Sequence, residues 1–266
     1  MAAVSGSDRR PAPRRALGWL RHTLRRAGWG IEDRRLVAEQ RHGRLGRAHR
    51  SWSGNSAGSN REWWDRYDWS AGGEEWTASA EWKQALIDDV LLPLVPAGAA
   101  VLEIGPGAGR WSQVLAARAS RLVLVDVSEE PLRRCRERLA GFDNVSYVHG
   151  RGRELPGIPD ASIDTVWSFD VFVHIAPPDF VAYLDEIARV LRVDGVAAIH
   201  HSDGRNRGRL LSRHGWRAPM SRELFAALAE PRGLAITRQF DAWGERGEFD
   251  LSAYGDAITV CRRRAG

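Results

Sequence analysis

Short apolar runs alternate with helical segments from residue 97 onward, and this alternation constrains the fold more than any other feature of the sequence. Apolar runs bounded by turn residues predict strands, and apolar residues at helical spacing predict helices. Strands are predicted over 99–104, 121–127, 145–150, 164–169, 195–201, 234–240 and 257–263, and helices over 111–119, 131–140, 179–192 and 221–228. Strands separated by helices in this way predict an α/β fold with right-handed crossovers between parallel strands.

The first 60 residues differ in composition from the rest of the chain. Residues 1–50 contain 13 arginines and four acidic residues, so the net charge of +5 comes from this segment and the remainder is slightly acidic. Residues 51–60 are rich in serine, glycine and asparagine. A tail and linker without core-forming residues is therefore predicted over 1–60 and is expected to be disordered. Leucines at helical spacing within it leave open a basic amphipathic helix or a targeting peptide.

The next segment, residues 61–95, is enriched in tryptophan. It holds five of the 12 tryptophans in the chain and ends in a predicted helix over 81–94, which Pro96 stops. Tryptophan rings are usually well buried, so they either complete a core or form one wall of a ligand pocket. We predict a helical lid over 61–95. Its tryptophans are Trp63, Trp64, Trp69, Trp76 and Trp82.

Composition excludes several classes of protein. With 43% hydrophobic and 27% charged residues, the chain has a globular profile, and no apolar run approaches the roughly 20 residues of a transmembrane helix. The two cysteines, Cys135 and Cys261, exclude a disulfide scaffold and offer no zinc-ligand spacing, so a reducing cytoplasm is the expected compartment. The slightly acidic body does not favour nucleic acid as its partner.

A glycine-rich loop carries the clearest chemical signal. Residues 101–109 (VLEIGPGAG) follow a predicted strand and open a helix, where glycines let the main chain approach a ligand and the helix N-terminus offers unpaired N–H groups. Asp126 ends the next strand, where an acid can accept both ribose hydroxyls of a nucleoside. Arg110 stands where a dinucleotide-binding motif needs its third glycine. The loop therefore favours a different nucleoside cofactor.

The pattern EIGPGAG at residues 103–109 resembles motif I of class I S-adenosylmethionine-dependent methyltransferases. Similarity continues at residues 125–128 (VDVS) and 162–170 (SIDTVWSFD) and covers roughly residues 95–263. The resemblance implies S-adenosylmethionine as cofactor. It also implies a Rossmann-like, doubly wound, mostly parallel seven-stranded sheet with helices on both faces, within a methyltransferase domain over 96–266. Shorter matches, such as IHHS at 199–202, resemble a bacterial subgroup associated with glycan and natural-product genes.

The resemblance implies roles for individual positions. The three glycines of the loop pass the main chain beneath the cofactor, Glu103 anchors the loop and reaches the methionine amino group, and Asp126 holds the ribose. Relatives often have Asp-Gly where this chain has Arg151-Gly152, so a backbone contact is the alternative to a carboxylate contact with adenine. The implied cofactor-binding residues are Glu103, Gly105, Gly107, Gly109, Asp126, Ser128, Gly152, Arg153, Ser168 and Phe169.

The acceptor is expected beyond the carboxyl ends of the later strands. The polar residues predicted there are Asp170, His174, His200, His201 and Asp203. We expect Asp170, His200 and His201 to be catalytic, because a hydroxyl acceptor must lose a proton and histidine is suited to take it. Neighbouring strand residues point to opposite faces, so one of the two histidines is expected to be structural. No metal is predicted; a divalent ion held by Asp170, His201 and Asp203 is the alternative.

Aromatic residues near the expected crevice indicate the kind of acceptor. Trp69, Trp76 and Trp216, together with His174, are predicted to bind substrate, and Trp243 is expected nearby. Tryptophan rings stack on sugar faces, which together with the subgroup resemblance predicts methyl transfer to a hydroxyl or amine of a sugar-containing small molecule. The alternatives are an RNA or protein methyltransferase that uses the basic tail, and a binding module without turnover.

Overall fold

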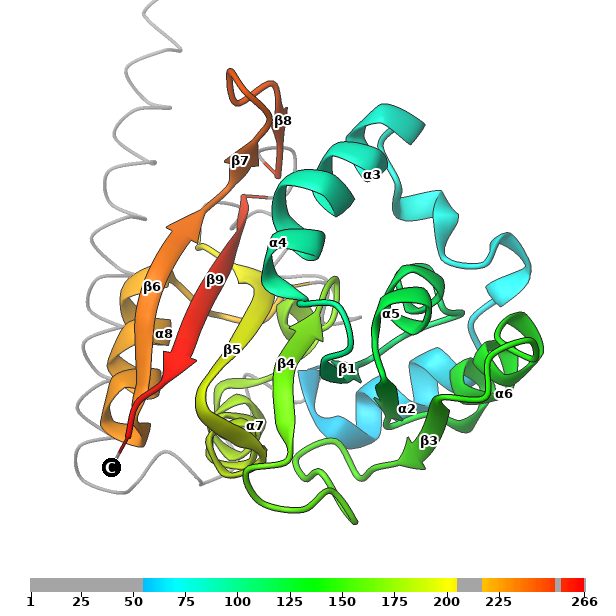
Figure 1. Ribbon diagram of the computed structural model, residues 1–266, viewed down its shortest axis with the longest axis horizontal. Helices are drawn as coiled ribbons and strands as arrows, with labels where there is room; N and C mark the ends of the chain where they lie inside the picture. Colours follow the sequence, from blue (N-terminus) through cyan, green and yellow to red (C-terminus); the bar gives the residue numbers. More distant parts are fainter. Residues whose placement is uncertain (1–54, 205–216, 252–254, 266) are drawn as a thin grey trace, which may run out of the picture.

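The computed structural model describes residues 55–204, 217–251 and 255–265, and its centre is a seven-stranded sheet (Figure 1). The strand order is β3-β2-β1-β4-β5-β9-β6. All strands are parallel except β9, which runs antiparallel to both β5 and β6. Their bounds are β1 Ala100–Ile104, β2 Arg121–Asp126, β3 Val145–His149, β4 Ile163–Ser168, β5 Leu191–Ser202, β6 Leu234–Phe240 and β9 Asp256–Arg263. The predicted α/β, mostly parallel sheet is confirmed.

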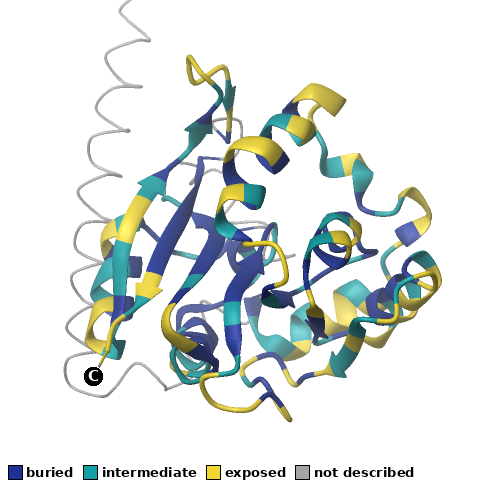
Figure 2. Ribbon diagram, viewed as in Figure 1, coloured by how far each residue is buried: buried dark blue, intermediate teal, exposed yellow. Residues whose placement is uncertain are grey.

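Helices cover both faces of the sheet, as predicted. One face packs on α7 (Pro177–Val190) and α8 (Arg222–Ala229) through side chains such as Phe180 and Phe225. The other face packs on α5 (Ser112–Arg118) and α6 (Glu129–Arg138). Central strands are buried on both faces, whereas the edge strands β3 and β6 are partly exposed (Figure 2). This pattern explains why the central strands are continuous apolar runs in the sequence.

The N-terminal part of the described chain forms helices beside the sheet. It contains α2 (Ala57–Asp65), the 3-10 turns η2 (Trp69–Ala71) and η3 (Glu74–Trp76), and a helix that runs through α3, η4 and α4. The bounds of that helix are α3 Ala80–Leu86, η4 Ile87–Leu91 and α4 Leu92–Leu94. The middle part, η4, is a π-helical segment within the helix predicted over 81–94.

Two details differ from the sequence-based expectations. The helix α2 begins at Ala57, inside the predicted linker, because the Ser56 side chain accepts a hydrogen bond from the Ser59 main chain and caps the helix. A short hairpin of β7 (Ala242–Trp243) and β8 (Phe249–Asp250) was not predicted. The remaining 3-10 turns are η5 (Phe172–His174) and η7 (Glu230–Arg232).

Several expectations concern residues that the structure does not describe. The tail over 1–50, residues 51–54 of the linker and Trp216 lie outside the described residues. Among the helices that are described, none is both long enough and apolar enough to cross a bilayer.

Candidate active site

The loop after β1 turns sharply at the carboxyl edge of the sheet. Gly105 and Gly107 have φ angles of 69° and 56°, a region that side chains other than glycine rarely adopt. A Cβ atom at Gly107 would lie 2.9 Å from the ring of Trp69, and one at Gly105 would lie 2.3 Å from the Val171 side chain. The glycines are therefore required both by the turn and by side chains that pack directly on the loop.

A cavity of about 270 Å³ lies between this edge of the sheet and the N-terminal helices, which is the scale of a small-molecule site. Its lining comes from residues within 57–76, 104–111, 125–131 and 169–175. Gly152, Tyr183 and Arg217 complete the wall. We call residues 57–76 the covering segment. Because it contributes tryptophan and tyrosine rings to the cavity, its aromatic residues are in contact with the site as well as with one another.

The covering segment is held together by aromatic contacts. Four rings, those of Trp64, Tyr67, Trp69 and Trp76, lie with every pair of centroids between 5.0 and 6.0 Å apart. Such distances are typical of packed aromatic pairs. Trp69 and Trp76, both predicted substrate residues, line the cavity from this cluster. The cluster leaves no ring-sized gap at its own centre, so any ligand contacts its outer surface.

Polar contacts attach the covering segment to both ends of the cavity. At one end, Ser128 donates a hydrogen bond to Asp65. At the other, the Asn60 side chain donates to the main-chain oxygen of His174 at 2.9 Å. His174, also a predicted substrate residue, lines the cavity, and its ring centroid lies 5.4 Å from that of Trp64.

Two buried acids lie at the β1–β2 end of the cavity. Burial raises the pKa of Asp126 to about 7, although the main-chain N–H of Ser128 donates to its carboxylate at 2.9 Å. Burial also raises the pKa of Glu103 to about 7, with Ser112 donating to it at 2.6 Å. Asp126 lines the cavity and ends β2. An acid with a raised pKa gains from hydrogen-bond donors on a ligand, and the two hydroxyls of a ribose are donors of this kind.

The other predicted cofactor residues fall into two groups. Gly152 and Phe169 line the cavity with Gly105, Gly107 and Asp126. The remaining five do not reach its lining, and each has a protein contact of its own. Gly109 packs against Arg138 and Cys135, Glu103 bonds Ser112, Ser128 bonds Asp65, Arg153 pairs with Asp179, and Ser168 donates to the Ile104 main-chain oxygen.

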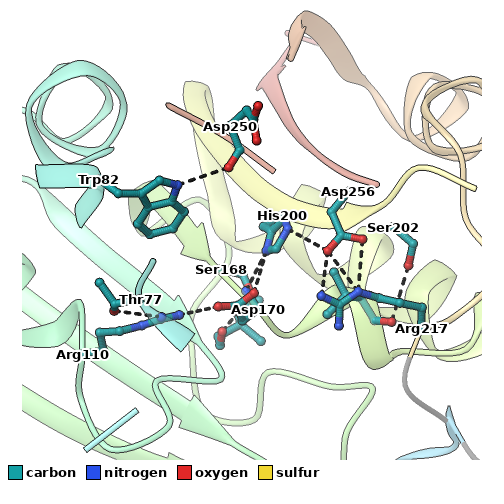
Figure 3. Close-up of polar contacts among 12 residues, drawn as sticks. Thr77, Trp82, Arg110, Ser168, Asp170, His200, Ser202, Arg217, Asp250 and Asp256 are labelled. Atoms are coloured by element: carbon teal, nitrogen blue, oxygen red, sulfur yellow. Dashed lines mark hydrogen bonds and ion pairs between the residues drawn. The ribbon is translucent and has the colours of Figure 1, made fainter. Parts of the chain in front are cut away.

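The β4–β5 end of the cavity carries paired charges (Figure 3). Asp170 follows β4, lines the cavity and forms an ion pair with Arg110. Burial alone would raise the pKa of Asp170, but Arg110 and His200 hold it well below its usual range. The guanidinium of Arg110 lies 4.7 Å from the ring centroid of Trp111, within cation–π distance. Asp170 therefore presents a permanent carboxylate to the cavity.

The two adjacent histidines of β5 point in different directions, as predicted from strand geometry. His200 stacks beneath Phe169, at 4.3 Å between ring centroids, and lies between Asp170 and Asp256. His201 is fully buried on the opposite face, where its ring nitrogens lie 2.8 Å from the Ser202 main-chain oxygen and 2.7 Å from Thr259 Oγ1. Burial lowers the pKa of His201 to about 4. Neither ring lines the cavity.

Asp203 and Trp243, both expected at the crevice, lie elsewhere. Asp203 accepts hydrogen bonds from the main chain and side chain of Arg222 at the start of α8. Trp243 is buried in the core, with its ring centroid 5.1 Å from that of Trp82. The alternative metal set of Asp170, His201 and Asp203 is not brought together. No His/Cys/Asp/Glu cluster suited to a metal was found among the described residues.

Three charged residues near the cavity were missed by the sequence-based prediction. Arg110 and Arg217 line the cavity, and Asp256 lies beneath it, fully buried. Arg110 was noted only as a departure from a dinucleotide motif. Asp256 stands directly before a predicted strand, but only an antiparallel direction of β9 brings the start of that strand to the carboxyl end of β5. The direction of β9 was the missing signal.

Comparison with known proteins supports one class. A family model described as a methyltransferase domain matches residues 101–195. A probable S-adenosylmethionine-dependent methyltransferase of Mycolicibacterium smegmatis is 38% identical over 38% of this chain and 37% of its own length. The dimethylglycine N-methyltransferase of Parasynechococcus marenigrum is 30% identical over 67% of this chain and 64% of its own length. The first curated relatives are thus matched over only 34–39% of their lengths.

Solved structures agree on the fold. A structure of a SAM dependent methyltransferase from Aquifex aeolicus superposes with a TM-score of 0.56 and 19% identity, covering 74% of this chain and 99% of that one. The described part of this chain therefore has the Rossmann-like fold of class I methyltransferases. The matched segment 101–195 supports a class I S-adenosylmethionine-dependent methyltransferase, with S-adenosylmethionine as the cofactor. None of the three proteins compared here has a name that refers to a glycan.

Proposed function

We propose that this protein is an S-adenosylmethionine-dependent methyltransferase that acts on a small-molecule acceptor. The proposal rests on one covered cavity with a different acid at each end. At one end lies Asp126, whose pKa is raised because its hydrogen bonds do not offset its burial; at the other lies Asp170, whose carboxylate stays ionised. The first end suits a nucleoside with ribose hydroxyls. The second suits an acceptor that donates a hydrogen bond.

At the nucleoside end, Asp126 would accept from the ribose hydroxyls, and the main chain at Gly105 and Gly107 would lie against the cofactor. Glu103 would anchor the same loop through Ser112. When bound, S-adenosylmethionine supplies an electrophilic methyl group on a sulfonium. Methyl transfer is an in-line displacement, so the main task of the chain is to orient the two reactants and exclude water.

At the acceptor end, the Asp170 carboxylate would hold the hydroxyl or amine that is methylated. A carboxylate that stays ionised accepts a hydrogen bond from either group, while Arg110 fixes its orientation. His174 also lines this end of the cavity and would take the proton that the acceptor loses when its oxygen or nitrogen gains the methyl group. The proposed site residues are therefore Asp170 and His174 for the acceptor, with His200 acting behind Asp170. His201 is left out because it faces away from the cavity.

The acceptor is proposed to be a small molecule with a flat or sugar-like face. Trp69 and Trp76 offer ring surfaces to the cavity, and aromatic rings pack on apolar sugar faces. The covering segment lies across the site and is bonded at both ends, which favours a small acceptor over a folded RNA or protein.

The test is a transfer assay with methyl-labelled S-adenosylmethionine. Purified full-length protein is incubated with separate pools of sugar nucleotides, aminoglycosides, small amines and RNA at a cofactor concentration below saturation, with Asp126→Ala as the variant of weakened cofactor binding. Label is expected in a small-molecule pool with wild-type protein, and at least about tenfold less of it with the variant. Transfer to RNA alone would contradict the proposed acceptor class, and label transfer by Asp126→Ala at the wild-type rate would contradict the proposed site.

A further inference from the structure

Buried charged and polar side chains form a continuous chain beneath the cavity, from Asp170 to Arg217 (Figure 3). His200 Nδ1 lies 3.2 Å from an Asp170 oxygen, and His200 Nε2 lies 3.4 Å from an Asp256 oxygen. Arg217 pairs with the same Asp256 carboxylate through Nη2 at 2.8 Å and Nε at 3.0 Å. His200 and Asp256 are 1% and 0% exposed, so both act on the site only through residues that line it, namely Asp170, Arg217 and Phe169.

The main chain of Asp170 depends on this chain of contacts. Its φ angle is +62°, a left-handed conformation that residues other than glycine, asparagine and aspartate rarely adopt. The main-chain N–H of Asp170 donates to His200 Nδ1 at 3.0 Å. Nδ1 therefore holds the main chain of Asp170, whereas its 3.2 Å approach to the Asp170 carboxylate is attractive only when the ring is protonated. Strained residues of this kind persist where surrounding contacts fix them, and they cluster at functional sites.

The contacts also define which ring nitrogen of His200 carries the proton. Nδ1 can accept from the Asp170 N–H only with its lone pair free, so in the neutral ring the proton is on Nε2. Nε2 makes no hydrogen bond but faces the Asp256 carboxylate at 3.4 Å, where the negative charge favours a proton on Nε2, and Arg217 balances the buried charge of Asp256. Each of these side chains is therefore oriented or charge-balanced by the next one, from Arg217 at one end to Asp170 at the other.

A purely structural role explains this arrangement less well. Burying two carboxylates, two guanidiniums and an imidazole costs free energy that well-packed apolar side chains would avoid. The five residues come from the loop after β1, the loop after β4, the end of β5, the start of β9 and the segment before α8. Only the end of this network at Asp170 combines cavity exposure with a strained main chain.

We propose that His200 and Asp256 are positioning residues for Asp170: Asp256 favours the His200 ring that is protonated at Nε2, and unprotonated Nδ1 in turn holds the main chain of Asp170, from which the carboxylate projects toward the acceptor. His200 is then not the group that takes the acceptor proton. The proposal rests on the proposed function in one respect, since it takes Asp170 to face the acceptor; the tautomer itself is independent of any activity.

The first test reads the tautomer directly, without an acceptor. Full-length protein labelled with ¹⁵N-histidine is titrated by long-range ¹H–¹⁵N NMR, and His200 is assigned by the signals lost in His200→Gln. At the high-pH plateau, Nδ1 is expected unprotonated and Nε2 protonated. Asp256→Asn presents an amide donor to Nε2 and is expected to reverse the two.

The matched control is Asp164→Asn. Asp164 is a part-buried carboxylate at the opposite end of β4, where it pairs with Arg192 and accepts from the Ala100 main chain at 2.7 Å. This variant should leave the His200 signals unchanged. A wild-type plateau with Nδ1 protonated, or an Asp256→Asn spectrum with the wild-type tautomer, would overturn the proposal even if the protein is an active methyltransferase.

The second test uses the acceptor that the transfer assay identifies. In His200→Asn the side-chain oxygen can take the place of Nδ1 and accept from the Asp170 N–H. In His200→Gln the longer side chain places its amide near the Nε2 position, so this hydrogen bond is lost. His200→Gln is expected to lower kcat roughly 10²-fold, the scale of a misplaced reacting group, and His200→Asn to retain at least about tenfold more turnover. Dissociation constants for S-adenosylhomocysteine should stay within about twofold. Equal loss in both variants would show the ring itself to be the base and overturn the positioning role.

The transfer assay and the NMR titration test separate conclusions, so the case in which no acceptor pool is methylated can be interpreted. The proposed function then fails, while the NMR titration still decides whether Asp256 sets the tautomer of His200.

Discussion

Acids at the two ends of the cavity have pKa values shifted in opposite directions. At the β1–β2 end, burial raises the pKa of both Glu103 and Asp126 to about 7. At the β4–β5–β9 end, burial acts in the same sense, but arginine and histidine partners lower the pKa of Asp170 and Asp256 below the ordinary value. At the β1–β2 end the acids lack enough hydrogen-bond donors from the protein, so a ligand can supply them. At the β4–β5–β9 end the protein's own cations already balance the carboxylate charges.

The difference indicates two ways of preparing a site. An acid whose burial is not offset by protein donors or cations binds strongly to a ligand that supplies donors. It therefore suits recognition of a cofactor with ribose hydroxyls. A compensated carboxylate keeps its charge and its orientation whatever the acceptor does, so it suits positioning. The predictions below test this contrast, and each affects one end more than the other.

The largest effect is expected for Asp170→Ala. Removing the carboxylate at the acceptor end should reduce methyl transfer to the identified acceptor by at least roughly 10²-fold, the scale for losing the orientation of a reacting group. The dissociation constant for S-adenosylhomocysteine should change by less than about twofold. Steady-state kinetics and calorimetry measure the two quantities, with Asp164→Ala as the control. Turnover within about threefold of the wild type would remove Asp170 from the site.

Asp126→Ala should have the reverse profile. The loss of a carboxylate that accepts from ribose hydroxyls should weaken binding of S-adenosylhomocysteine by about 1.5–3 kcal/mol, the scale of charge-assisted hydrogen bonds. This corresponds to roughly 10- to 150-fold in the dissociation constant. Calorimetric titration measures it. If affinity stays at the wild-type value, Asp126 does not hold the ribose.

Gly107→Ala tests the close approach of the covering segment to the cofactor loop. The new Cβ would meet the Trp69 ring at 2.9 Å in addition to the strained φ of 56°. Gly98→Ala is the matched control, because Gly98 has a φ of 78° and nothing within 4 Å of an added Cβ. Denaturant unfolding should show a loss of about 1–2 kcal/mol at Gly98 and about 1 kcal/mol more at Gly107. Equal losses would mean that Trp69 yields without cost.

The smallest effect is a pH dependence confined to the cofactor end. Below the pKa of about 7, Asp126 is protonated in the free protein and accepts from ribose hydroxyls more weakly than the carboxylate does. Affinity for S-adenosylhomocysteine should therefore rise with pH and level off above about pH 7.5, by at most about tenfold per pH unit for each acid. Calorimetry from pH 5.5 to 8.5 measures the slope. Glu103→Gln isolates the part due to Asp126, and a flat profile in that variant would contradict the raised pKa.

The two ends also differ in how far sequence predicts them. The cofactor end is formed by a contiguous stretch from Glu103 to Ser128, whose glycines and acids stand at spacings that local structure imposes. The predicted strands matched the observed ones, and the loop glycines and Asp126 were placed correctly at the carboxyl edge. The acceptor end is assembled from residues far apart in the chain. Pairing of Asp256 with His200 depends on β9 lying antiparallel beside β5, which apolar periodicity does not reveal.

Individual side chains show the same limit. The strand rule predicted that only one of His200 and His201 faces the site end of the sheet, but not which one. Trp69 and Trp243 looked equivalent in sequence, yet one lines the cavity and the other packs on Trp82 in the core. Tertiary packing determines which of two similar residues faces the cavity, and the composition of the sequence does not predict that packing.

The central claim is that the cavity binds the nucleoside of S-adenosylmethionine at the β1–β2 end. The most direct test is a pair of calorimetric titrations of full-length wild-type protein at pH 8, one with S-adenosylhomocysteine and one with NAD. One molecule of S-adenosylhomocysteine is expected to bind per chain, with no saturable binding of NAD. Tight binding of NAD, or no binding of S-adenosylhomocysteine by folded protein, would contradict the account.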